Sequence, residues 1–385
     1  MPSRYLIVLP DDAATPILDA IGKAKKTLRV KMFVFSDPAL IDAVIGAHKR
    51  GVKVQVMLNP ERRSGEEDNE PTRKRLQKVG IEVKDSNPAV DLTHEKSMVV
   101  DDEVAFIKSL NWATKNLTET RDYAVVTDHR HEVDEVLACF EADWERKRFE
   151  PGDKAHLIWC PINGRDRIAE FIDAAKHTLF VENERYQDAV ILERLVRAAE
   201  RGVKVHVMAR PPHSLKKDKL VEGVGGLRIL DDVGIKIHKL KGLKLHGKML
   251  LADGVAAIVG SINLAPGSFD SRRELAIEVR DPEVVDRLHR IAKQDWENSH
   301  PMDLSDEGLL ADLEDRQEGA AQTLAIEADK KTRKKAKKEA KKKAARKAAK
   351  TKKPSKAPKK SKAKPSKTPK KSKTKKTKKA RKRKS

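Results

Sequence analysis

The stretch "IGKAKKTLRVKMFVFSDPALIDAVIGAHKRGVKVQVML", residues 21–58, decides the fold because the chain contains it twice. The second copy, "IDAAKHTLFVENERYQDAVILERLVRAAERGVKVHVMA", covers residues 172–209 at a constant offset of 151. Residues 37–50 and 188–201 carry apolar residues at helical spacing, and each segment ends in "RGVKV". There the glycine suits a helix stop, and the β-branched run that follows begins a strand. Strands separated by such helices predict βαβ units and a largely parallel sheet.

A second repeated block follows each copy. It reads "THEKSMVVDDEVAFIKSLNWATKNLTETRDYAVV" at residues 93–126 and "LHGKMLLADGVAAIVGSINLAPGSFDSRRELAIEV" at residues 245–279. Each copy then closes with a predicted helix that ends in "DW", at Asp143 and Asp295. We therefore expect two similar α/β halves, residues 1–150 and 151–299.

The polar residues of these blocks share one spacing. A histidine is followed by lysine at +2, aspartate at +7, asparagine at +17 and a carboxylate at +28 in both copies. The first set is His94, Lys96, Asp101, Asn111 and Asp122, and the second is His246, Lys248, Asp253, Asn263 and Glu274. A strand is expected after each lysine, so the histidine and lysine of a pair project from the same face. Chance agreement at five positions is remote, and the sets therefore indicate a duplicated catalytic constellation.

Two of these acids stand apart from the rest. Asp101 and Asp253 fall where the chain must turn from one predicted strand into the next, and aspartate is a common turn residue. We interpret both as structural. The remaining His, Lys, Asn and acid residues are the candidate catalytic groups.

The pattern HxKxxxxD, followed by "GSxN" and a downstream acid, resembles the phospholipase D superfamily over residues 1–299. The first copy departs from the pattern twice: Lys108 stands where the second copy has Gly260, and Asp122 replaces the usual Glu. Neither change removes a functional group, so we expect activity to survive. The resemblance implies two α/β sandwich halves about a pseudo-twofold axis, with one shared active site.

It also implies a two-step phosphodiester exchange through a phosphohistidine, with neither a metal nor a cofactor. The residue chemistry agrees, because lysine and asparagine side chains suit the stabilisation of a phosphodiester's developing negative charge. Asp122 and Glu274 would each hold one histidine ring nitrogen and fix its tautomer. By family analogy His94 attacks phosphorus and His246 protonates the leaving group, although the residues alone leave the order open. We place Ser109, Ser261 and Lys244 beside the substrate.

Near the second motif, "IKIHKLKGLKLHGK" at residues 235–248 gathers several lysines. One interpretation is a basic lip that attracts an anionic substrate, and the other is a solvated run of charge. The polar segment "VENERYQD" at residues 181–188 is expected to line the pocket.

The charge of the chain is divided unevenly along its 385 residues. Residues 1–299 hold 49 basic and 49 acidic side chains, whereas residues 300–329 hold 1 basic and 9 acidic ones. Residues 330–385 hold 28 Lys, 4 Arg and a single acidic residue, with no aromatic residue. We therefore expect an acidic linker and a disordered, histone-like tail that binds polyanions without reading sequence.

Composition also excludes several classes of protein. No apolar run is long enough for a membrane span, and the run at residues 5–9 is too short for a signal-peptide core. The two cysteines, Cys139 and Cys160, lack zinc-type spacing and predict buried free thiols. A cytoplasmic protein is expected, possibly peripheral at the membrane or associated with the nucleoid, and a monomer is plausible.

Three functions fit these features. The first is a phospholipid-acting phosphodiesterase or phosphatidyltransferase of the cardiolipin synthase type. The second is a DNA- or RNA-directed phosphodiesterase held on its substrate by the tail. The third is a non-catalytic binder of nucleic acid or membranes, which the intact polar sets disfavour. The neutral body, which offers no overall basic groove, favours the lipid. The residues leave open whether water or an alcohol is the acceptor.

Overall fold

The computed structural model describes residues 3–61, 67–211 and 220–309. The predicted tail, residues 330–385, and most of the predicted acidic linker lie outside this range. Both predicted halves fall within one compact unit. Among the described residues, no helix has the length and apolar composition needed to cross a bilayer.

The first sheet is built almost entirely from the N-terminal half. Its strands are β1 (Arg4–Leu9), β2 (Thr27–Met32), β3 (Lys53–Leu58), β4 (Glu82–Asp85), β6 (Ser97–Val100), β7 (Val104–Lys108) and β8 (Thr120–Thr127). They lie in the order β1-β8-β7-β6-β2-β3-β4. Only β2, β3 and β4 run parallel, and the other neighbours are antiparallel. The expectation of a largely parallel sheet was therefore wrong, because the strands of the His-Lys block return as hairpins.

The second sheet repeats this order. It contains β9 (Ile158–Cys160), β10 (Thr178–Asn183), β11 (Lys204–Ala209), β12 (Lys236–Leu240), β14 (Met249–Ala252), β15 (Ala256–Gly260), β16 (Arg272–Val279) and β17 (Ser299–Pro301). The path β9-β16-β15-β14-β10-β11-β12 matches the first sheet strand for strand, and β17 adds one strand at the edge. The duplication in sequence is thus a duplication of topology.

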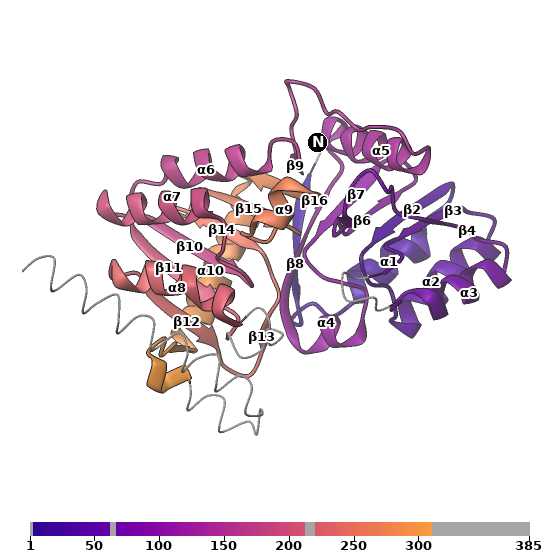
Figure 1. The fold of residues 1–385 in the computed structure, drawn as a ribbon. Coiled ribbons are helices and arrows are strands. Elements are labelled where there is room, and N and C mark those ends of the chain that lie inside the picture. Colours follow the sequence, from indigo (N-terminus) through magenta and orange to yellow (C-terminus); the bar gives the residue numbers. More distant parts are fainter. Residues whose placement is uncertain (1–2, 62–66, 212–219, 310–385) are drawn as a thin grey trace, which may run out of the picture. The chain divides into compact units, whose positions relative to one another are not determined.

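Helices cover the outer face of each sheet and fill the space between the sheets (Figure 1). The outer helices are α1 (Thr15–Lys23), α2 (Pro38–Lys49) and α3 (Glu70–Lys78) on the first sheet, and α6 (Gly164–Ala174), α7 (Ala189–Glu200) and α8 (Leu220–Asp232) on the second. Helices α5 (Arg130–Trp144) and α10 (Pro282–Glu297) share a third apolar core with the inner faces of both sheets. The expected α/β architecture with two similar halves is confirmed.

The central helices begin where the sequence predicted. Asp37 and Asp188 precede α2 and α7, and each side chain accepts a hydrogen bond from the backbone N–H three residues later. Such a cap satisfies a donor that the helix itself leaves unpaired. The same residue type at the same repeat position therefore starts the equivalent helix in each half.

Each half also lends a short strand to the other. β5 (Leu92–Thr93), just before the first motif, pairs with β16 of the second sheet. β13 (Lys244–Leu245), just before the second motif, pairs with β8 of the first. This exchange carries each histidine across to the neighbouring half, which sets the geometry of the site.

Two arginine–aspartate bridges join the halves beneath these strands. Arg121 donates two hydrogen bonds to Asp295, at 2.7 and 3.0 Å, and Arg273 donates two to Asp143, at 3.1 and 3.2 Å. All four side chains are buried, so their charges are compensated only across the junction. The aspartates of the repeated "DW" ends thus fix the two halves together.

Candidate active site

The two His-Lys pairs enter the site from equivalent positions. His94 and Lys96 lie between β5 and β6, whereas His246 and Lys248 lie between β13 and β14. The histidine side chains are nearly buried, and the ammonium group of each lysine donates back to the carbonyl of its own histidine. The expected pairing on one face is therefore present twice.

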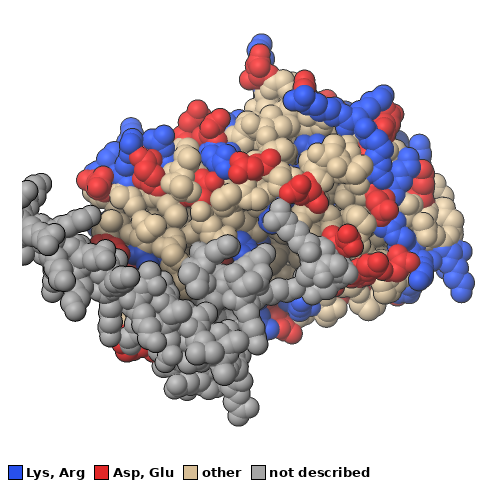
Figure 2. Space-filling view, in the orientation of Figure 1, with Lys and Arg blue, Asp and Glu red and all other residues tan. Residues whose placement is uncertain are grey.

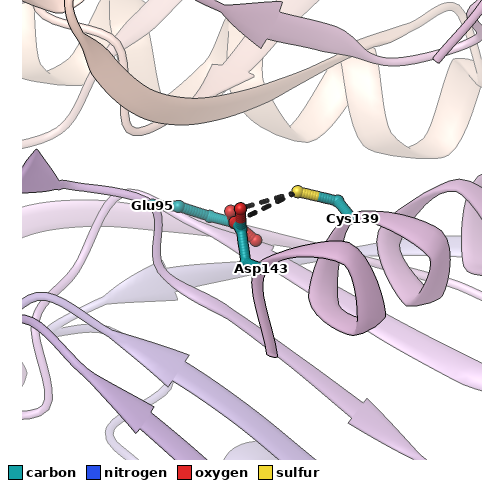
Figure 3. A group of neighbouring side chains, drawn as sticks. All are labelled: Glu95, Cys139 and Asp143. Carbon is teal, nitrogen blue, oxygen red and sulfur yellow. Dashed lines mark hydrogen bonds between the residues drawn. The ribbon is translucent and has the colours of Figure 1, made fainter. Parts of the chain in front are cut away.

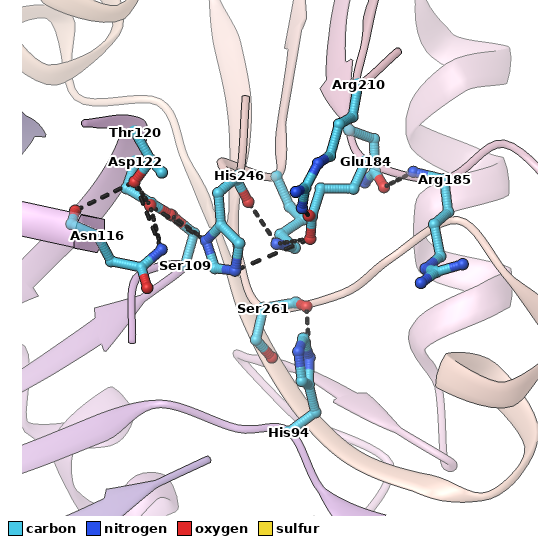
Figure 4. A network of polar contacts seen from close by, with 12 residues as sticks. His94, Ser109, Asn116, Thr120, Asp122, Glu184, Arg185, Arg210, His246 and Ser261 are labelled. Atoms are coloured by element: carbon cyan, nitrogen blue, oxygen red, sulfur yellow. Dashed lines mark hydrogen bonds and ion pairs between the residues drawn. The ribbon is translucent and has the colours of Figure 1, made fainter. Parts of the chain in front are cut away.

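Each histidine takes its carboxylate from the opposite half. His94 Nδ1 lies 2.8 Å from Glu274 Oε2, and His246 Nδ1 lies 2.8 Å from Asp122 Oδ1. The exchanged strands cause this, because the backbone N–H of His94 donates to Arg273 and that of His246 donates to Arg121, the residues just before the two acids. The shorter Asp122 reaches its ring at the same distance as Glu274. The two sequence sets thus interlock around one site (Figure 4).

Hydroxyl groups hold both carboxylates in place. Ser109 and Thr120 each donate to Asp122 at 2.6 Å, and Ser261 and Ser268 donate to Glu274 at 2.6 and 2.7 Å. The sequence analysis placed Ser109 and Ser261 beside the substrate, but in the structure both are fully buried and their hydroxyls are directed at the acids. Their contacts are those of residues that orient the catalytic carboxylates.

The buried surroundings shift the protonation of both members of the first pair. Burial, with the positive charges of Lys96 and Lys248, lowers the pKa of His94 to about 3 despite the nearby Glu274. Burial and Lys248 lower the pKa of Lys96 to about 7. The pKa of Glu274 is lowered by His94 and Lys96, although burial alone opposes this. His94 is therefore a neutral imidazole at pH 7, held by an ionised acid.

Two amide oxygens complete the polar set. Asn111 Oδ1 and Asn263 Oδ1 are buried and have no hydrogen-bond partner among the described residues. Buried amide groups in proteins normally find partners, so an unpaired pair at corresponding positions points to a bound ligand or water. The sequence-predicted histidines, lysines, asparagines and acids all lie in this one region.

The second half adds charged groups that sequence reasoning did not assign. Glu184, just after β10, accepts from Lys248 Nζ at 2.8 Å and from Arg210 Nη1 at 2.9 Å, and lies 3.8 Å from His246 Nε2. Lys248, His246 and Arg210 lower the pKa of Glu184 well below its usual range, although burial opposes this. The polar segment at residues 181–188 therefore does contribute a side chain to the site, as the sequence suggested.

The first half is apolar at the corresponding place. Phe33, 151 residues before Glu184, packs edge-on against His94 with ring centroids 4.8 Å apart, and the Lys96 ammonium lies 5.2 Å from its ring centroid. One histidine thus meets a phenyl ring and the other a carboxylate. The two halves of the site are alike in their motifs and different in their walls.

Lys108, the first departure from the sequence pattern, turns away from the polar set. It is fully buried, with its ammonium 4.7 Å from the ring centroid of Trp112 and without a hydrogen-bond partner among the described residues. Burial lowers its pKa well below the usual value. At Gly260 a β-carbon would lie 2.3 Å from the carbonyl oxygen of Leu275, so a side chain fits only in the first half.

The remaining predicted residues have local contacts. Asp101 and Asp253 adopt positive φ angles in the expected turns, and each carboxylate accepts from three backbone N–H groups at the start of β2 or β10. This is the contact pattern of a structural residue. Lys244 is exposed and pairs with Glu119 at 3.0 Å, so its charge is partly neutralised.

A buried group behind the first motif has the composition of a metal site. Glu95, Cys139 and Asp143 bring their ligand atoms within 4.8 Å of one another (Figure 3). The ammonium of Lys31 already lies 2.9 Å from both carboxylates and 3.4 Å from the sulfur. Those carboxylates raise the pKa of Lys31 against the effect of burial, so the lysine itself supplies the cation. Cys139 and Cys160 are buried and free, as predicted.

The fold and the crossed histidine–carboxylate pairs are those of the phospholipase D superfamily. The family model described as "Cardiolipin synthase, PLD-like domain" matches residues 17–144 and 168–296. The chain therefore belongs to this family, and the resemblance drawn from the two motifs is confirmed.

Three similar proteins illustrate its range. Human mitochondrial cardiolipin hydrolase is 32% identical over 157 residues, which is 39% of this chain and 60% of that protein. Cardiolipin synthase B of Salmonella typhimurium is 24% identical over 317 residues, 69% of this chain and 73% of that protein. The polyphosphate kinase of Porphyromonas gingivalis shares the fold, with a TM-score of 0.62 at 16% identity over 78% of this chain and 48% of that one. The chain thus spans well under two thirds of two of these proteins.

Proposed function

We propose that the protein is a phospholipase D-type phosphodiesterase or phosphatidyltransferase that acts on an anionic phospholipid through a phosphohistidine. The observation that carries the proposal is the crossed arrangement of two histidines, each held by a buried carboxylate of the other half. Two lysines and two unpaired asparagine oxygens converge on the same place. Such a set can hold a phosphodiester and supply a nucleophile and an acid.

His94 is the proposed nucleophile. Its Nδ1 is engaged by Glu274, so the lone pair for attack belongs to Nε2. Its low pKa keeps that lone pair free at pH 7. In the first step His94 Nε2 forms a bond to phosphorus while the bond between phosphorus and the leaving alcohol oxygen breaks.

His246 is the proposed proton donor. Asp122 on Nδ1 and Glu184 near Nε2 place negative charge on both sides of its ring, which favours the imidazolium form. It protonates the departing oxygen, then takes a proton from water or an alcohol. That oxygen attacks phosphorus, the bond from phosphorus to His94 breaks, and both rings return to their first state. Lys96 and Lys248 stabilise the phosphoryl oxygens throughout.

A phospholipid substrate is supported by the relatives named cardiolipin hydrolase and cardiolipin synthase B. The charge distribution agrees, because basic and acidic side chains alternate on the face drawn in Figure 2 and are equal in number over residues 1–299. A nucleic-acid groove normally carries a basic excess. The lysine-rich segment 330–385 is then a tether to an anionic membrane surface.

One feature favours a nucleic-acid phosphodiesterase as a second candidate. The same segment has 28 lysines and no aromatic residue, a composition that binds DNA or RNA through phosphates alone. Both candidates use the same site and differ only in what the tail brings to it.

The deciding experiment assays the purified protein, and a version ending at residue 309, on phosphatidylglycerol and cardiolipin vesicles and on single- and double-stranded DNA. Lipid turnover that persists in excess EDTA and disappears in His94→Ala is expected. Turnover of DNA alone, also lost in His94→Ala, would replace the lipid by nucleic acid. Near-normal turnover by His94→Ala would remove the proposed mechanism for either substrate.

A further inference from the structure

The walls of the active site differ between halves at three equivalent positions. At the offset of 151, the second half has Glu184, Arg185 and Arg210 where the first half has Phe33, Val34 and Asn59. Glu184 and Arg210 pair with each other, so the arginine between them in the set is the one left to explain.

Arg185 is held rigidly at its backbone and is unpaired at its tip. Its N–H donates to Asn183 Oδ1 at 3.1 Å, and Asn183 Nδ2 donates to the carbonyl of Ile262, the residue before Asn263. The side chain is half-buried and extends away from Glu184 toward the level of the His94 ring (Figure 4). Its guanidinium has no hydrogen bond or ion pair among the residues that the structure describes. An arginine in this state presents a fork of donors that matches a phosphate.

An apolar pocket begins beside it. The pocket has a volume of about 860 Å³ and lies between α7, α8 and the start of α9 (Pro266–Asp270). Its apolar lining is Ala189, Leu192, Val196, Ile229 and Pro266. Gln187, another lining residue, is two positions after Arg185, and Pro266 is three after Asn263. At no more than about 3.6 Å per residue, both ends of the pocket are close to the phosphate-binding groups.

We propose that Arg185 binds a second phosphate of an anionic phospholipid, and that the pocket between α7 and α8 receives the acyl chain attached next to that phosphate. Cardiolipin, whose two phosphates are joined by one glycerol, is the simplest lipid of this kind. The inference rests on the proposed function and names its substrate. A nucleic-acid strand also carries a second phosphate, but it offers nothing apolar to fill the pocket, which is why the lipid is preferred.

The test compares substrates within one enzyme. Turnover of cardiolipin, phosphatidylglycerol and a single-stranded oligonucleotide is measured for the full-length chain in detergent micelles of constant surface charge, with bis(4-nitrophenyl) phosphate as the reference. The variants are Arg185→Ala, Arg185→Lys and Ile229→Asp; the last position is half-exposed, so the charge is tolerated by the fold. Arg194→Ala is the matched control, because Arg194 lies on α7 and pairs with Asp173.

Arg185→Ala is expected to lower the ratio of kcat/KM for cardiolipin over the reference at least tenfold, about the effect of one charged hydrogen bond. Arg185→Lys restores part of the loss, Ile229→Asp lowers the same ratio, and Arg194→Ala leaves it at the wild-type value.

An unchanged ratio in Arg185→Ala, in an enzyme that does hydrolyse cardiolipin, overturns the subsite and leaves the proposed function standing. A loss confined to the oligonucleotide assigns Arg185 to nucleic acid and overturns the lipid subsite. A wild-type enzyme that turns over the reference diester and no lipid removes the proposed function itself.

Discussion

The different surroundings of the two histidines lead to a prediction that depends on the leaving group. A pKa of about 3 leaves His94 neutral at pH 7 in all but roughly one molecule in 10⁴. His246, between Asp122 and Glu184, is the residue placed to give up a proton. Loss of a general acid typically costs about 10²- to 10⁴-fold, but only when the leaving group needs a proton. An alkoxide of a lipid needs one, whereas 4-nitrophenolate does not.

His246→Ala should therefore lose at least about 10²-fold in phospholipid turnover. With bis(4-nitrophenyl) phosphate it should release one equivalent of 4-nitrophenol per site and then stall, because no base remains to activate water for the second step. His94→Ala should show neither the burst nor turnover. Stopped-flow absorbance measures both, and His289→Ala, on α10 outside the site, serves as the control.

A burst in His94→Ala and none in His246→Ala would reverse the two roles. If neither variant gave a burst while the wild-type enzyme remained active, the covalent intermediate itself would have to be abandoned.

Three further predictions test the surroundings of the site. Because the pKa of Lys96 is lowered to about 7, its positive charge is present below that pH and lost above it; kcat/KM should therefore fall as the pH rises through about 7, while kcat, measured with the anionic substrate bound, should hold to higher pH. Lys31→Met leaves Glu95 and Asp143 buried without their cation and should cost about 3–5 kcal/mol in urea unfolding, whereas a loss below about 1 kcal/mol would show that the cluster is not tightly paired. Burial raises the pKa of Glu182 from 4.5 to about 8, so its ionisation removes stability as the pH rises from about 4.5 to 8; Glu182→Gln should raise the Tm relative to wild type more at pH 8.5 than at pH 5, and an equal change at both would contradict this.

Much of the fold could be predicted from the repeat. The helix caps Asp37 and Asp188, the turns at Asp101 and Asp253 and the strand after each lysine depend on local residue preferences, which a sequence displays directly. The mixed sheet was missed because strand direction depends on where a hairpin returns. That choice is made by tertiary packing and leaves no local pattern.

The members of the candidate site were predictable, but their pairing was not. Duplication identified Asp122 and Glu274, whereas the crossing that gives each to the other half's histidine depends on the exchange of β5 and β13. Two-residue strands carry almost no periodicity, so the exchange was invisible in the sequence. The place where the halves break the repeat, Glu184 against Phe33, was the available signal for the asymmetry of the walls.

The proposed covalent step can be observed directly. The His246→Ala protein is mixed with bis(4-nitrophenyl) phosphate, quenched at alkaline pH to preserve phosphoramidates, digested and sequenced by mass spectrometry. We expect a 4-nitrophenyl phosphoryl group on His94, at close to one per chain. The same group on any other residue, or its absence in an enzyme that has released 4-nitrophenol, would contradict the account.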